Sequence, residues 1–178
     1  MPTDARAATA LPFPDLFRMT RFPAEPPVLG EQDRFVLDLF RLLRLFRERY
    51  DEAWLARAEA LAQRRLGPEA DDLMGAAVML DNELRCRGVT AYASGRPGDH
   101  RAEGAEVLFL AFLDAAVERA DAAAARAASA LGVDDSRALA ALACRFADLC
   151  ARGDDGLSPA AIPRITAKAK LPVRNVFE

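Results

Sequence analysis

One stretch, "QDRFVLDLFRLLRLFRERY", residues 32–50, decides the fold class of this chain. At 100° per residue its large apolar side chains share one broad arc, which is the pattern of an amphipathic helix. Burying each of them stabilises the folded state by about 1.5–3 kcal/mol, before the loss of conformational entropy is subtracted. We therefore expect a helix at the centre of the core. The arc consists of Phe35, Val36, Leu39, Phe40, Leu42, Leu43, Phe46 and Tyr50.

The opposite side of this helix is charged, with Arg34, Asp38, Arg41, Arg44 and Glu48. Such a row of arginines can bind an anion. It is also typical of a solvated face on which opposite charges pair four residues apart. The sequence favours the solvated face, with Arg34–Asp38 and Arg44–Glu48 as its pairs.

Further helices are predicted outward from this one, over residues 51–66, 68–87, 102–131 and 134–152. Either Asp51 caps the first of them or the central helix continues through Tyr50, and Asp134 or Asp135 caps the last. Gly88 and Gly132 follow helical stretches at the position where glycine commonly ends a helix. Residues 88–101 form the main internal loop. The prediction is an all-α bundle of five or six helices.

The composition points to a single globular domain in a reducing compartment. The chain has 178 residues, of which 52% are apolar, a net charge of −3 and three cysteines without a CxxC pair. Its longest unbroken apolar run, "VLFLAFL", has seven residues, and a membrane span needs about 20. The first residues lack the apolar core of a secretory signal. We expect a cytoplasmic protein without contact to membranes.

The two ends of the chain differ from the predicted bundle, residues 31–153. Residues 1–30 hold six of the eleven prolines, so no long helix fits there. Phe13, Phe17 and Phe22 give this arm apolar anchors, which pack either on the chain's own body or on a partner subunit. Residues 154–178 form a basic helix-and-tail segment.

Asp114, Glu118 and Asp121 recur along one side of the predicted 102–131 helix. Paired carboxylates can bind a metal or transfer protons. No ExxH motif accompanies them, and the chain has one histidine. A solvated acidic stripe is the expectation, without a metal or cofactor.

The single histidine lies in "RPGDHRAE", residues 96–103, just before the apolar stretch that follows. Asp99 is placed to cap the next helix, with His100 in its first turn. A catalytic histidine would need a nucleophile, a second base or a metal. The chain has no GxSxG and no phosphate-binding loop, so no catalytic residue is predicted. If the protein were an enzyme, Asp99, His100 and Glu103 would be its most plausible catalytic cluster.

The same stretch resembles the proline-x-Asp-His motif of the TorD-like chaperones, which are all-helical proteins that help to load cofactor into molybdoenzymes. The matching residues are Pro97, Asp99 and His100, followed by an apolar helix. That family usually has a glutamate before the proline, where this chain has Arg96. The resemblance implies that Asp99 and His100 lie at a surface that handles a client protein.

The C-terminus, "ITAKAKLPVRNVF", is similar in spacing to the helix-turn-helix of TetR-type regulators. Arg164, Lys168, Lys170 and Arg174, against Glu178, suit contact with phosphates. Lys170 stands where that motif has its turn glycine. The other interpretation is a basic strap folded across the bundle.

Together these patterns predict a non-enzymatic protein-binding module, an adaptor or chaperone-like protein that forms a homodimer. Its predicted contact residues are Pro97, Asp99 and His100 with the three arm phenylalanines. The alternative is a DNA-binding regulator that acts through residues 158–178. An enzyme is the third possibility.

Overall fold

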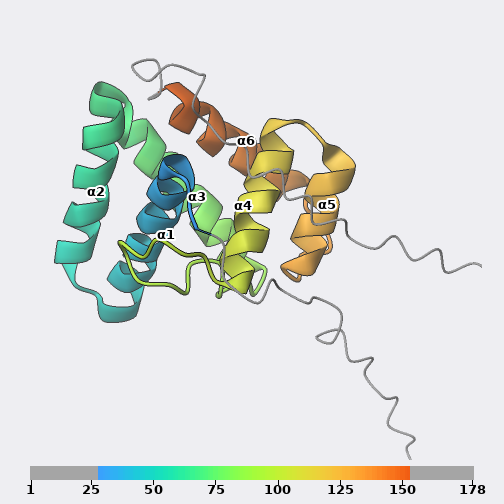
Figure 1. Cartoon of the computed structure of the whole chain (residues 1–178), viewed down its shortest axis with the longest axis horizontal. Helices are drawn as coiled ribbons and strands as arrows, with labels where there is room; N and C mark the ends of the chain where they lie inside the picture. Colours follow the sequence, from blue (N-terminus) through green and yellow to red (C-terminus); the bar gives the residue numbers. More distant parts are fainter. Residues whose placement is uncertain (1–27, 153–178) are drawn as a thin grey trace, which may run out of the picture.

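Six α-helices form the part of the chain that the computed structural model describes, residues 28–152 (Figure 1). This confirms the predicted all-α bundle. Residues 1–27 and 153–178 lie outside the described part, and with them most of both predicted end segments. The helices are α1 (Glu31–Arg49), α2 (Glu52–Leu66), α3 (Ala70–Cys86), α4 (Gly104–Val117), α5 (Asp121–Ala130) and α6 (Arg137–Arg152), with a 3-10 turn (Gly67–Glu69) between α2 and α3.

Helix α1 lies at the centre of the core, as its apolar arc predicts. Phe40 is fully buried and meets three other rings edge-on, at centroid distances of 6.0 Å to Tyr92, 4.9 Å to Phe109 and 5.3 Å to Phe146. These rings come from the internal loop, α4 and α6. Edge-to-face contacts of this kind add stability beyond the area that they bury. One aromatic cluster therefore joins α1 to the second half of the bundle.

Most predicted helix ends are confirmed. Asp51 caps α2 by accepting a hydrogen bond from the backbone N–H of Ala53 at 2.9 Å. Gly88 and Gly132 follow α3 and α5 with φ of +80° and +89°, the left-handed conformation that glycine adopts without strain. Tyr50 is the exception to the apolar arc, because it leaves α1 in a left-handed conformation and is 87% exposed.

The prediction of one continuous helix over residues 102–131 is wrong, because the helix is interrupted between α4 and α5. Arg119 adopts φ of +51°, and the backbone N–H groups of Arg119 and Ala120 bond to the carbonyls of Ala116 and Ala115. This pattern is a Schellman motif, which normally has glycine in the left-handed position. The sequence has neither glycine nor proline there, so its strongest stop signals are missing.

Within residues 28–152, no helix combines the length and the apolar character that crossing a membrane requires.

Arg119 provides a test of this break. Replacing Arg119 with glycine should raise the free energy of unfolding by about 0.5 kcal/mol, because a left-handed conformation strains side chains that have a Cβ. Arg126→Gly, in the middle of α5, should instead lower it by about 1 kcal/mol. Urea denaturation of both variants measures the difference. A loss of stability in Arg119→Gly would contradict the assigned break.

Candidate functional site

The loop from Gly88 to Glu103 connects α3 to α4 and covers the charged side of α1 (Figure 1). Arg44 on α1 donates to the carbonyl of Gly95 at 3.1 Å, and Asp38 accepts from the N–H of Gly98 at 2.8 Å. The expected solvated face is therefore wrong for this side of α1. Asp38 and Arg34 bind loop residues and not each other, whereas the predicted Arg44–Glu48 pair is present at 3.3 Å.

The centre of this covered face is an ion pair between Arg41 of α1 and Glu106 of α4. Both side chains are fully buried. The guanidinium Nε and Nη2 donate to the two carboxylate oxygens at 2.8 Å each. Two parallel bonds of this kind are the strongest geometry available to an arginine–carboxylate pair.

The remaining donors of Arg41 hold the loop. Nη1 donates to the carbonyl of Asp99 at 3.1 Å and to Asp38 at 3.4 Å, and Nη2 donates to the carbonyl of Arg101 at 3.0 Å. Together with the bonds to Glu106, all five guanidinium N–H groups have acceptors, which a buried arginine requires. Arg41 thereby fixes the positions of the loop carbonyls on either side of His100.

Glu106 is equally well satisfied, since it also accepts the N–H groups of Gly95 and Glu103 at 2.9 Å each. Burial alone would raise the pKa of Glu106, but the hydrogen bonds from Arg41 and these two backbone groups outweigh it and hold the pKa below its ordinary value. The ionised pair therefore stabilises the folded protein at neutral pH. That contribution is lost as the pH falls through the pKa of the folded carboxyl.

Gly95 is required by this packing. A Cβ at this position would lie 2.5 Å from Nη2 of Arg41 and 2.8 Å from its Cζ. The loop backbone therefore lies directly against the guanidinium, in a space that no other residue fits without a shift.

A second buried network anchors the beginning of the loop. Tyr92 donates its hydroxyl to Asp81 of α3, and Arg47 of α1 donates to the same carboxylate. Tyr92 is 1% exposed and Asp81 is 2% exposed. Burial and the neighbouring charge of Asp81 raise the pKa of the Tyr92 hydroxyl, which keeps it a proton donor. The loop is thus fixed at both ends.

The segment around Pro97 is a tight turn. Pro97 and Gly98 occupy its two central positions, with φ of +90° at Gly98, and the N–H of Asp99 bonds to the carbonyl of Arg96 at 3.1 Å. Proline followed by a glycine with positive φ is the pattern of a type II turn. The Asp99 carboxylate accepts the N–H of Arg96 at 2.9 Å.

The predicted role of Asp99 as a helix cap is therefore wrong, since its side chain closes this turn instead. Helix α4 begins at Gly104, and His100 lies before it, outside its first turn. The N-cap is Glu103, whose N–H is accepted by Glu106. The carboxylate of Glu106 therefore takes part both in capping the start of α4 and in the buried ion pair with Arg41.

His100 is exposed on the surface of the loop. Its Nδ1 lies 3.0 Å from Nη1 of Arg34, and because an arginine only donates, Nδ1 accepts and Nε2 carries the proton. Its carbonyl accepts the N–H of Leu29 at 2.9 Å, beside an antiparallel bridge between Val28 and Arg101. The ring therefore has one nitrogen bonded to α1, and within residues 28–152 no group bonds to the other.

Asp99, His100 and Glu103 do not form a proton relay in this arrangement. Their side chains bind three different groups, which are the Arg96 N–H, Arg34 and the Ser94 hydroxyl. Among residues 28–152, no cluster of three or more histidines, cysteines or acidic residues could hold a metal ion.

Several predicted contact residues lie outside the described part of the chain. They are the arm phenylalanines Phe13, Phe17 and Phe22 and the basic residues Arg164, Lys168, Lys170 and Arg174. Four buried residues that hold the loop were not predicted as site residues: Arg41, Glu106, Asp81 and Tyr92.

The expected acidic stripe is divided by the break after α4, which places Asp121 at the start of α5. Asp114, Glu118 and Asp121 are all exposed, as expected of a solvated stripe. Partial loss of hydration, with repulsion from Asp33 and Glu118, raises the pKa of Asp114 to about 6. Asp33 comes from the first turn of α1, so acidic groups from two helices lie near each other.

Comparison with known proteins adds no relative, because no protein-family model, curated protein or solved structure matches the chain.

Glu106→Gln should lower the free energy of unfolding by about 3–5 kcal/mol, because it leaves the buried guanidinium of Arg41 with the more distant carboxylate of Asp38, at 3.4 Å, as its counter-charge. Glu48→Gln is the matched control, since it removes the same charge from the half-exposed Arg44 pair and should cost less than about 1 kcal/mol. Chemical denaturation at pH 7 measures both. Equal losses would contradict the central role of the buried pair.

Asp114→Asn should raise the melting temperature at pH 7.5 and have little effect near pH 4. A folded-state pKa above the unfolded value means that ionising Asp114 disfavours the folded state, and this cost develops as the pH rises through about 6. Because the side chain is partly exposed, we expect a gain below about 1 kcal/mol. Asp134→Asn, in the turn before α6, is the control. A gain that is independent of pH would contradict the assignment.

Proposed function

We propose that this chain is a non-enzymatic, chaperone-like protein-binding module whose partner meets the His100 loop, defined here as residues 95–101. One observation carries the proposal: the backbone of this loop is fixed by buried charges while Asp99 and His100 remain exposed. A surface that is already ordered loses little conformational entropy when it binds. Exposed residues on loops held by a rigid scaffold are commonly binding residues.

The chemistry of the loop surface favours a partner rich in hydrogen-bond acceptors. Arg34, Arg96 and Arg101 bring three positive charges to the neighbourhood of His100, against the exposed carboxylate of Asp99 and the carboxylate of Asp38, which is bonded to the loop from below. The Nε2–H of His100 adds a further donor. Carboxylates and backbone carbonyls are the acceptors that proteins offer to such groups. We expect an acidic or extended segment of a protein.

An apolar contact lies beside these charges. Val28 is 69% exposed and pairs with Arg101 in the antiparallel bridge. Apolar surface next to a set of donors is the usual composition of a protein-binding patch. The partner segment therefore presents an apolar side chain close to its acceptors.

The resemblance to TorD-like chaperones supports the same surface. Pro97 and Asp99 form the turn, His100 follows it, and α4 begins shortly afterwards. The client-handling role that the resemblance implies requires Asp99 and His100 to be accessible, and both are exposed. Arg96 makes this version of the motif more basic than the usual form.

The other predictions about partners stay predictions. The DNA-binding alternative depends on residues 158–178, which lie outside the described part, and no contact in residues 28–152 favours it over protein binding. A homodimer and a cytoplasmic location belong to the proposal in the same way.

Two variants of His100 separate its structural contact from its proposed binding role. Asparagine reproduces the Nδ1 side of the ring and keeps an acceptor for Arg34, whereas glutamine extends toward the Nε2 position. We expect His100→Asn to weaken capture of protein partners from the native cell extract severalfold. His100→Gln should retain more of it, and the melting temperature should change little in either.

Quantitative mass spectrometry of the captured proteins provides the measurement. Asn82→Ala, at an exposed position of α3, is the control for non-specific loss. If both His100 variants capture the same proteins as the unmodified chain and as Asn82→Ala, the loop is not the binding surface and the proposal fails.

A further inference from the structure

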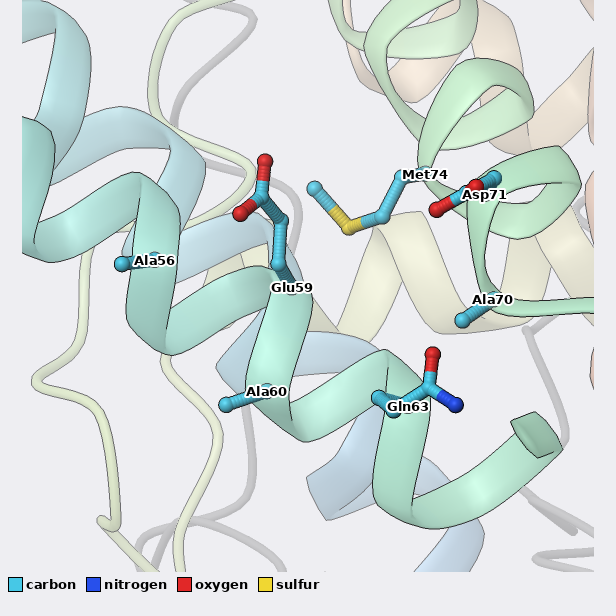
Figure 2. Close-up of a pocket in the computed structure, with 7 residues that line it drawn as sticks. All are labelled: Ala56, Glu59, Ala60, Gln63, Ala70, Asp71 and Met74. Atoms are coloured by element: carbon cyan, nitrogen blue, oxygen red, sulfur yellow. The ribbon is translucent and has the colours of Figure 1, made fainter. Parts of the chain in front are cut away.

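An open hollow of about 470 Å³ lies between α2 and α3, on other elements than the His100 loop (Figure 2). Figure 2 shows Glu59 of α2 and Met74 of α3 extending toward each other across it, with Asp71 beside Met74. The residues that line it are Ala56, Glu59, Ala60, Gln63, Ala70, Asp71 and Met74.

The lining combines an apolar floor with an acidic rim. Ala56, Ala60 and Met74 supply small or flexible apolar surface, and one helical turn beyond Met74 lies the exposed Val78. Glu59 and Asp71 are exposed, and neither has an ion-pair partner within residues 28–152. A segment with both apolar and basic side chains is complementary to this combination.

The end of α6 lies next to this hollow. Arg152, the last described residue, has its Nη1 3.7 Å from Oε1 of Glu69. Glu69 directly precedes Ala70 and Asp71, which line the hollow. Figure 1 shows the same proximity, with the end of α6 close to the connection between α2 and α3. The 26 residues that follow Arg152 therefore start beside the hollow.

The composition of those residues fits the lining. From 156 to 178 the chain has four basic residues and one acidic residue, interspersed with Ile162, Ile165 and Leu171. Five residues span up to about 17 Å when extended, so a linker over 153–157 is long enough to bring the basic part over the hollow. A tethered segment also binds at a high effective concentration, which allows weak contacts to hold it.

We infer that the hollow between α2 and α3 is the docking site of the chain's own basic C-terminal segment, residues 158–178. Its apolar side chains would lie over Ala70 and Met74, the buried residues of the lining, and its lysines and arginines would pair with Glu59 and Asp71. In this state the basic residues are engaged within the chain and are withheld from any phosphate backbone.

Photo-crosslinking in the full-length chain tests the inference. p-Benzoylphenylalanine in place of Gln63, at the rim of the hollow, should form an adduct with residues 158–178 at the mass of a single chain. The same probe in place of Ser129, an exposed position on α5, should not. Lys168→Glu combined with Lys170→Glu should lower the yield at Gln63 severalfold, and high salt should do the same, because both weaken attraction to the acidic rim.

Peptide mapping of the adducts distinguishes the outcomes. An adduct that joins two chains would mean that a second copy's segment occupies the hollow, and it would overturn docking within the chain. The absence of any adduct to residues 158–178 would overturn the site. An undiminished yield in the lysine variant would overturn the electrostatic contribution. Far-UV circular dichroism checks that each variant retains its helices.

Discussion

A guanidinium buried in the core must have an acceptor for each of its donors, and this requirement shapes the centre of the structure. Arg41 meets it with Glu106, Asp38 and two carbonyls of the loop. An unpaired charge in that position would cost several kcal/mol, so the loop is not a mere connection between α3 and α4. Its carbonyl groups accept hydrogen bonds from Arg41 that water molecules would accept if the guanidinium were exposed. The exposed face of the His100 loop lies on the opposite side of the loop from Arg41. Its conformation therefore depends on the buried hydrogen bonds between Arg41 and the loop carbonyls.

The helices are the part of the fold that local sequence patterns determine. Apolar spacing located α1, α2, α3 and α6, and polar caps and glycines located most of their ends, because these effects act within a few residues. The break after α4 escaped prediction. Its Schellman motif has Arg119 at the position where glycine normally signals the end, so the local preference of an alanine-rich stretch pointed to a continuous helix. The packing of α4 and α5 against each other overrides that preference.

The buried site depends on contacts that no local pattern encodes. An arginine among other charged residues on a helix is typical of a solvated face, and the loop that covers Arg41 is distant in sequence. One signal was present: Leu37 and Leu45 lie on the same side of α1 as Arg41, and Leu37 is fully buried. Apolar residues within a charged arc indicate that another segment covers it. For His100 the sequence correctly located the loop, but the Arg34 contact and the turn closed by Asp99 required the three-dimensional arrangement.

The separation of Arg41 and Glu106 along the chain, 65 residues, has a consequence for when the His100 loop takes its shape. The pair forms only once α1 and α4 have come together. An incompletely folded chain holds the same residues 95–101 but has no anchor for their carbonyls. If the proposed partner recognises the ordered loop, it binds folded copies of this protein in preference to incompletely folded ones.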